Sequence, residues 1–375
     1  MIVESAIRSS GPVVEGLTLR RISMPIDPPM ISGGHHVASI DVNVVEVRAA
    51  GHTGFGYTFA FSPEEADAVT PLLSYLAAPL VGTPVADVRA HCAQMWQRIN
   101  FIGRAGAGVM ALSAIDTALW DVHARRLGVP LCTLLGLPRA KHRLYGAGGW
   151  LSLSDEELIA EAARFRDAGY TAYKMRAGSP DWRTDAKRVQ LVRDTLGTQM
   201  RLMVDVNQAW DVPTAVRFAN AVADADLYWL EEPVDAEDFE GLAAVRRGAP
   251  MAIAAGETVY GVAPFDAMVR AGSADVLQPD LMRAGGITGF LEIASLARAA
   301  RLRLASHLFT EVSVHLVGLA GPSAMVEYLP GWFDELFDGA PSTTTGYASA
   351  ADSPGLGVAL RPTTIDRWEL RRIEL

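Results

Sequence analysis

Three short stretches of the sequence decide the fold: RLMVDV at residues 201–206, LYWLEE at 227–232 and MAIAAGE at 251–257. Each is a brief apolar run that ends on a carboxylate, with the length typical of a buried β-strand. The segments between them carry apolar residues at helical spacing, as in residues 213–223. Strands that alternate with helices in this way predict a parallel sheet, because each helix returns the chain to the same end.

The same pattern continues on both sides of these stretches. Further strands are predicted at residues 143–147, 171–175, 274–277, 302–306 and 324–327. Seven or eight consecutive strand–helix units favour a closed parallel barrel over an open sheet. We therefore expect an α/β chain with a barrel domain over residues 141–335.

The remaining segments predict a second, smaller domain. Residues 13–48 contain alternating apolar and polar positions typical of strands, and residues 63–135 have helical periodicity. We expect an α+β domain over residues 1–140. The last segment, residues 336–375, begins rich in Ser, Thr, Gly and Pro and is expected to return to that domain.

The composition excludes several classes of protein. The chain has 375 residues, half of them hydrophobic, with 33 basic and 43 acidic side chains and a net charge of −10. This is ordinary globular composition, without the basic patches of a nucleic-acid-binding protein. Two cysteines are too few for a disulfide framework, and we find neither a signal peptide nor a membrane span. We expect a soluble cytoplasmic protein with a small-molecule carboxylate substrate.

Carboxylates end three successive strands of the predicted barrel at equal spacing. Asp205, Glu231 and Glu257 should therefore meet at the carboxyl end of the barrel, where such barrels carry their active sites. Any one of them alone is more simply explained as a solvated residue or a helix cap. Three together would repel one another without a cation, and three oxygen ligands suit Mg²⁺ better than zinc.

The neighbouring strand ends add groups for acid–base chemistry. Lys174 and Arg176 alternate on one strand, so both side chains should point into the same barrel mouth. Asp280 and His307 end two neighbouring strands, where the carboxylate can orient the imidazole and raise its basicity. Glu327 ends the last strand. We take Lys174, Arg176, Asp280, His307 and Glu327 as the candidate catalytic residues.

These residues, in this order, resemble the enolase superfamily and its mandelate racemase subgroup. The resemblance covers nearly the whole chain and includes AIDTALWD at 114–121, GVPL at 128–131, DVN at 205–207, WLEEP at 229–233, GE at 256–257, GGIT at 285–288 and PGLG at 354–357. It implies a (β/α)7β modified TIM barrel with an α+β capping domain and three Mg²⁺ ligands, Asp205, Glu231 and Glu257. It also implies a homo-oligomer, since relatives commonly form dimers or octamers.

The resemblance implies that the α-proton of a carboxylate is removed to give an enediolate. Lys174 would help to spread the developing charge, and Glu327 would donate a proton or a short hydrogen bond. The subgroup usually has Lys-x-Lys, whereas this chain has Lys174-Met175-Arg176. A guanidinium is effectively always protonated, so Arg176 is a poor base and a better clamp for a carboxylate or hydroxyl.

Candidate substrate contacts come from the mouth of the barrel and from the loop at residues 25–36, which in the family covers it. They are Asn207, Tyr57, His35 and His36, of which the last three are also explained as packing or exposed polar residues. Gly148 and Gly149 stand where mandelate racemase has a substrate-binding serine, and they would let the backbone approach a ligand.

Three functions remain open from the sequence. With one secure base, His307, dehydration of a sugar acid to a 2-keto-3-deoxy acid is favoured. A racemase or epimerase of a 2-hydroxy acid would need a base on each face of the substrate. A barrel that keeps the metal but has lost catalysis through the lysine-to-arginine change is the third alternative.

Overall fold

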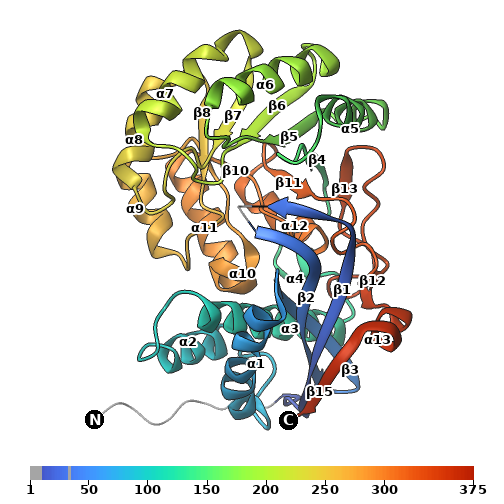
Figure 1. Ribbon diagram of the computed structural model, residues 1–375. Helices are drawn as coiled ribbons and strands as arrows, with labels where there is room; N and C mark the ends of the chain where they lie inside the picture. The colour runs from blue at the N-terminus through green and yellow to red at the C-terminus, as the bar shows by residue number, and fades with distance from the viewer. Residues whose placement is uncertain (1–10, 33–34) are drawn as a thin grey trace.

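The computed structural model describes residues 11–32 and 35–375, without the side chains of residues 27–36. Figure 1 shows a barrel of strands and helices above a smaller cap of sheet and helices. The far ends of β1 (Gly16–Ser32) and β2 (His35–Ala49) extend from the cap to the barrel. The cap therefore reaches the end of the barrel at which the site lies.

Eight parallel strands form the barrel, as the sequence predicts. Seven follow each other in sheet order from β10 back to β4, and β11 pairs with β4. A parallel bridge between Ala305 and Met325 joins the two ends of this series and closes the barrel. The strands are β4 (Lys141–Ala147), β5 (Ala172–Arg176), β6 (Arg201–Asp205), β7 (Leu227–Glu231), β8 (Ala252–Ala255), β9 (Val276–Leu277), β10 (Arg303–Leu304) and β11 (Met325–Tyr328).

The helices follow the strands and cover the outside of the barrel (Figure 1). Several begin at the capping residues that the sequence offers; the hydroxyl of Ser154, for example, accepts a hydrogen bond from the backbone of Glu157. They are α5 (Asp155–Asp167), α6 (Trp182–Leu196), α7 (Val212–Ala221), α8 (Phe239–Gly248), α9 (Ala263–Ala271), α10 (Leu281–Ala284), α11 (Gly286–Ala300) and α12 (Thr310–Leu316). Short 3₁₀ turns lie at Ala223–Ala225 and Val317–Ala320.

The barrel interior is filled by one residue from each strand or its end. The layer combines large and small side chains, and the rings of Trp229 and Tyr145 meet edge to face at 5.3 Å. Alanines elsewhere in the same layer leave the space that these rings occupy. The eight residues are Tyr145, Ala172, Met203, Trp229, Ala254, Val276, Ala305 and Met325.

The cap is an antiparallel sheet with helices packed against it. Its strand order is β15-β1-β2-β3, with β3 at His52–Ala60 and β15 at Glu369–Glu374. The last strand of the chain thus pairs with the first. The helices are α1 (Pro63–Ala77) with the 3₁₀ turn Ala78–Leu80, α2 (Val88–Arg98), α3 (Ala107–Arg126), α4 (Leu131–Leu134) and α13 (Pro362–Trp368).

Helix α3 is the element that joins the cap to the barrel. On one side it packs against β3 so closely that a Cβ atom at Gly56 would lie 2.1 Å from the carbonyl oxygen of Ala114. On its other side the hydroxyl of Ser113 donates to the carbonyl of Met282 at 2.6 Å. Asp116 accepts hydrogen bonds from the backbone and the hydroxyl of Thr288 at 2.9 and 2.7 Å. The cap is therefore fixed directly to α10 and α11.

Between β11 and α13 the chain crosses back along the barrel to the cap. It forms the short strands β12 (Phe337–Asp338), β13 (Tyr347–Ser349) and β14 (Ala359–Leu360). β13 pairs with β4, and β12 pairs with β14. Among the described residues, no helix combines the length and the apolar character needed to cross a lipid bilayer.

Candidate active site

The three strand-end carboxylates meet at one point. Asp205 and Glu231 are the last residues of β6 and β7 and pair directly in the parallel register, and Glu257 follows β8. One oxygen atom of each lies within 4.8 Å of the others, and all three side chains are buried. Three buried hard oxygen donors with no protein nitrogen or sulfur ligand fit Mg²⁺, whose charge would offset their mutual repulsion. These three residues are the ones that would hold the metal.

Other side chains hold the carboxylates in place. The indole Nε1 of Trp229 donates to Glu231 Oε2 at 2.9 Å, and the amide of Gln278 donates to the same oxygen at 2.8 Å. The backbone N–H of Asn207 donates to Asp205 Oδ1 at 2.9 Å. The carboxylates of Asp205 and Glu231 therefore have a fixed orientation before any ligand binds.

Lys174 lies fully buried among the carboxylates. Its ammonium forms ion pairs with Asp205 at 3.4 Å, with Glu327 at 2.9 Å and with Glu231. Burial alone would lower the pKa of this lysine, but the charges of Glu231 and Glu327 outweigh burial and raise it. Lys174 is therefore a fixed positive charge at the end of the barrel.

Arg176 points into the same mouth from the next inward-facing position of β5. Its guanidinium forms an ion pair with Asp205 and stacks over Trp150, 5.1 Å from the ring centroid. Its Nε has no hydrogen-bond partner among the described residues. A cation held in this way, with donors to spare, can bind an anionic or hydroxylated ligand but is not suited to accept a proton.

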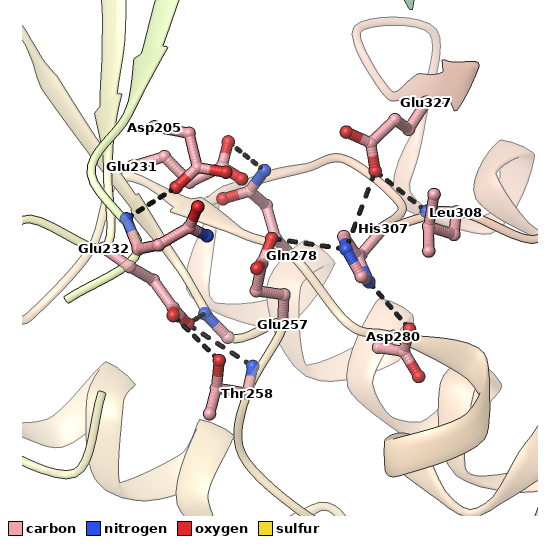
Figure 2. A network of polar contacts seen from close by, with 12 residues as sticks. Asp205, Glu231, Glu232, Glu257, Thr258, Gln278, Asp280, His307, Leu308 and Glu327 are labelled. Carbon is pink, nitrogen blue, oxygen red and sulfur yellow. Dashed lines mark hydrogen bonds and ion pairs between the residues drawn. The ribbon is translucent and has the colours of Figure 1, made fainter. Parts of the chain in front are cut away.

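His307 and Asp280 form the predicted dyad. His307 Nδ1 lies 2.7 Å from Asp280 Oδ2, and the other oxygen of Asp280 accepts the backbone N–H of Arg283 at the start of α10. His307 Nε2 points toward the carboxylates, 3.5 Å from Glu257 and 4.0 Å from Glu327 (Figure 2). Burial alone would lower the pKa of His307, but Glu257, Asp280 and Glu327 together raise it to about 9.

Glu327 is held by the strained turn that follows His307. Leu308 and Phe309 both have positive φ angles, 48° and 49°, which bulky side chains rarely adopt. The turn directs the N–H of Leu308 onto Glu327 Oε2 at 2.9 Å. Burial would raise the pKa of Glu327, but Lys174 and His307 outweigh it and lower the pKa. These contacts favour the ionised form, so proton donation by Glu327 stays a prediction.

A cavity of about 530 Å³ opens beside this cluster, between the barrel and the cap. Arg176, Glu257 and His307 form its charged end, and Asn207 lines the same wall. Glu257, His307 and the guanidinium of Arg176 therefore face one space, which is large enough for a small organic acid.

The sequence analysis missed several residues of the site. Glu232, one residue after a metal-facing carboxylate, accepts hydrogen bonds from the backbone of Gly256 at 3.3 Å and from the hydroxyl of Thr258 at 2.9 Å. It thereby fixes the loop that carries Glu257. Trp229 and Gln278 hold Glu231, as described above. Gln278 stands next to Pro279-Asp280 at a strand end. This position could have identified Gln278 as a residue of the site.

Some of the predicted substrate contacts are not brought to the cavity. Tyr57 is buried in a cluster of aromatic rings, and its hydroxyl donates to Glu311 at 2.8 Å, so its polar atom is already committed. Gly148 and Gly149 do not line the cavity, and Cβ atoms there would meet Glu161 and Met175 instead of a ligand. The backbones of His35 and His36 pair with β1, but their side chains lie outside the described residues.

Comparisons with family models agree with this geometry. Residues 16–136 match the mandelate racemase / muconate lactonizing enzyme N-terminal domain. Residues 157–364 match the enolase C-terminal domain-like model. The two matches together cover most of the chain.

Individual relatives are similar over nearly their whole length. A 3,6-anhydro-α-L-galactonate cycloisomerase from Streptomyces coelicolor is 35% identical over 89% of this chain and 93% of its own. L-talarate/galactarate dehydratase from Salmonella typhimurium is 31% identical over 90% of this chain and 86% of its own. The crystal structure of that dehydratase, liganded with Mg and L-lyxarohydroxamate, has a TM-score of 0.93 and 29% identity, and the match covers 100% of this chain and 97% of that one.

Proposed function

Because the chain belongs to the mandelate racemase / muconate lactonizing enzyme family of the enolase superfamily, we propose that it is a Mg²⁺-dependent sugar-acid dehydratase. It removes the α-proton of the acid and expels the β-hydroxyl as water, giving a 2-keto-3-deoxy acid. The observation that carries this proposal is the position of His307 Nε2, 3.5 Å from a carboxylate of the metal cluster and oriented by Asp280 on its other nitrogen.

Each step uses a group that faces the cavity. His307 Nε2 takes the proton from the α-carbon, and the electron pair of the broken C–H bond moves into an enediolate. The carbon–oxygen bond to the β-hydroxyl then breaks, and the proton on Nε2 leaves with it as water. The resulting enol tautomerises to the 2-keto acid. Bound Mg²⁺ supplies electrophilic stabilisation of the negative charge on the substrate carboxylate.

The two cations of β5 have separate roles in this scheme. Lys174, buried among Asp205, Glu231 and Glu327, adds positive charge next to the substrate carboxylate. Arg176 clamps a carboxylate or hydroxyl oxygen and stays protonated throughout. Racemisation needs a proton acceptor on the face opposite His307, and an arginine in that place argues against it.

A single assay separates the alternatives. The enzyme with Mg²⁺ is incubated in D₂O with a set of aldonic and aldaric acids, and the products are followed by NMR and by semicarbazide trapping of 2-keto acids. The proposal expects a 2-keto product. Exchange of the α-proton without a keto product would instead show racemisation or cycloisomerisation. Intact Mg²⁺ binding without either reaction would show a non-catalytic barrel.

We also propose a homo-oligomer in the cytoplasm. Phe101 is 97% exposed and its neighbour Ile102 is 55% exposed, an apolar pair that a subunit contact would cover. Both cysteines are free and buried, which suits a reducing compartment. Light scattering after gel filtration tests the assembly, and a single-chain mass would contradict it.

A further inference from the structure

The two ends of the cavity differ in charge. At the barrel end stand Arg176, Glu257, His307 and Arg283. Arg176 pairs with Asp205 and Arg283 donates to the carbonyl oxygen of Glu257 at 2.7 Å, and the Nε of each has no hydrogen-bond partner among the described residues. The groups that can bind an ionised carboxylate therefore lie at the end where the proton is removed.

The cap end of the cavity is apolar. Among the side chains that the structure describes, the cap contributes Phe59, Phe61, Val69 and Met110 to the wall, with alanines between them. Leu329 and Trp332, from the segment after β11, complete this end. None of these six side chains carries an oxygen or an amide, and the one N–H donor among them, Nε1 of Trp332, is buried within the wall.

A row of aromatic rings makes this end stiff. Trp150 stacks on Trp332 with the rings nearly parallel, at 6.1 Å and 2°. Trp332 meets Phe61 edge to face at 5.5 Å, and Phe61 packs against Phe59 at 5.9 Å. Because the rings support one another, the wall cannot easily rearrange to expose a polar group to a ligand.

The charged residue that the described cap adds to the cavity has the wrong sign for an acid. Glu65 lines the rim, and its carboxylate accepts the backbone N–H of Phe61 at 3.0 Å. Its negative charge would repel a second carboxylate at this end of the substrate. A diacid therefore meets a partner at the barrel end and repulsion at the cap end.

We propose that the cavity selects sugar acids with one carboxylate and an apolar far end, such as 6-deoxy acids. The inference rests on the proposed function, since it places the reacting carboxylate at the metal. A terminal hydroxyl buried against this wall loses its hydrogen bonds to water without replacement. Apolar pockets discriminate against an added hydroxyl by up to roughly 100-fold, and an ionised carboxylate is worse.

The test uses acids that differ only at the sixth carbon. Three series keep the four stereocentres fixed: L-fuconate, L-galactonate and galactarate; L-rhamnonate, L-mannonate and L-mannarate; and 6-deoxy-D-gluconate, D-gluconate and D-glucarate. We expect kcat/KM to be roughly 10- to 100-fold lower for the acid that ends in a hydroxymethyl group than for the acid that ends in a methyl group. It should be lower still for the acid that ends in a second carboxylate. In a series that the enzyme turns over, the hydroxymethyl acid or the diacid could react as fast as the 6-deoxy acid or faster. That result overturns the inference and leaves the proposed function standing. If no series shows either α-proton exchange or a keto product, that result contradicts the proposed function itself.

A substitution in the wall provides an independent measurement. Met110→Gln places an amide at the apolar end and should narrow the methyl-to-hydroxymethyl ratio by roughly tenfold. Leu370→Gln makes a similar apolar-to-amide change on an exposed residue outside the cavity and should leave the ratio unchanged. An unchanged ratio in a folded Met110→Gln enzyme contradicts the proposal. If thermal melting shows that this variant does not fold, the wild-type series alone decides.

Discussion

Two residues apart on one strand, Lys174 and Arg176 share the carboxylate of Asp205 but have different surroundings. Lys174 is fully buried and is surrounded by three carboxylates. Arg176 reaches the cavity and rests on the ring of Trp150. The same oxygen of Asp205 contacts both cations. The single change from lysine to arginine thus leaves His307 as the group suited to move a proton.

Substitution of His307 tests this assignment. His307→Asn should lower α-proton exchange and product formation together by roughly 1,000-fold, because the general base is lost while the cavity keeps its shape. Arg176→Ala should mainly raise KM, since it removes a clamp. Deuterium exchange at the α-carbon, followed by NMR for both epimers of an accepted acid, measures the first effect. Near wild-type exchange of one epimer by the His307→Asn enzyme would show that Lys174 or Arg176 is the base.

Loss of one metal-facing charge should show in binding as well as in activity. Glu231→Gln should weaken Mg²⁺ binding by roughly 100-fold or more and remove turnover, because one of three anionic oxygens becomes a neutral amide. Isothermal titration with Mg²⁺ measures the affinity. Glu311→Gln is the matched control, since Glu311 is equally buried but contacts Tyr57 and not the cluster. Unchanged Mg²⁺ affinity in Glu231→Gln would refute the metal assignment.

At the scale of elements, α3 links the cap to the helices that follow the catalytic strand end. Ser113 binds the carbonyl of Met282 on α10, and Asp116 binds Thr288 on α11. Asp280, which orients His307, begins α10. The cap therefore contributes to the placement of Asp280 and His307 as well as to the cavity wall.

Removal of one hydroxyl at this junction should weaken it measurably. Thr288 Oγ1 donates to Asp116 and accepts the indole N–H of Trp120 at 2.9 Å, so Thr288→Val leaves the buried carboxylate of Asp116 and the half-buried indole of Trp120 without this partner. We expect a loss of about 2 kcal/mol in the free energy of unfolding, measured by urea denaturation. Thr195→Val, which removes a hydroxyl bonded within α6, should cost clearly less. Equal losses in the free energy of unfolding for the two variants would show that the junction contributes no more to stability than a hydroxyl bonded within a helix.

Sequence reasoning recovered the elements better than their contacts. All eight barrel strands were predicted because short apolar runs that alternate with helices are a local signal. The family and the barrel with its capping domain are confirmed. Glu232 and Gln278 were missed because their partners are set by the register between strands, and Trp229 was missed although its partner Glu231 lies on the same strand. The burial of Tyr57 could not be predicted because the rings that enclose it come from residues 309, 333 and 337, more than 250 positions away. The domain limits near residues 140 and 335 stay a prediction.

For the whole molecule, His315 makes stability depend on pH. This buried ring joins the barrel to α4 and to the returning tail, because it accepts the N–H of Cys132 at 3.2 Å and contacts the carbonyl of Leu356 at 3.1 Å. Burial lowers its pKa from 6.5 to about 4, so the neutral form is favoured in the folded chain. Below pH 6.5 His315 binds a proton in the unfolded chain but stays neutral in the folded chain. The free energy of unfolding therefore falls until about pH 4.

This contribution is large enough to measure. The loss between pH 6.5 and 4 should reach roughly 3 kcal/mol at most. Urea denaturation of the wild type and of His315→Gln at several pH values gives the slopes to compare. The wild-type free energy should fall more steeply on acidification, whereas His52→Gln, on the exposed start of β3, should behave like the wild type. Parallel slopes for wild type and His315→Gln would contradict the assignment.

The pairing of β1 with β15 has a consequence for how the protein is made. Thr18 and Glu374, which bond across these strands, are 356 residues apart, and the entire barrel is encoded between them. During translation the cap sheet therefore stays incomplete, with one edge of β1 unpaired, until the ribosome has synthesised the whole barrel and β15. Helix α3 and β3 are adjacent in sequence and can dock early, while the β15 edge closes last. A nascent chain released early would expose this open edge, a natural point for chaperones to bind.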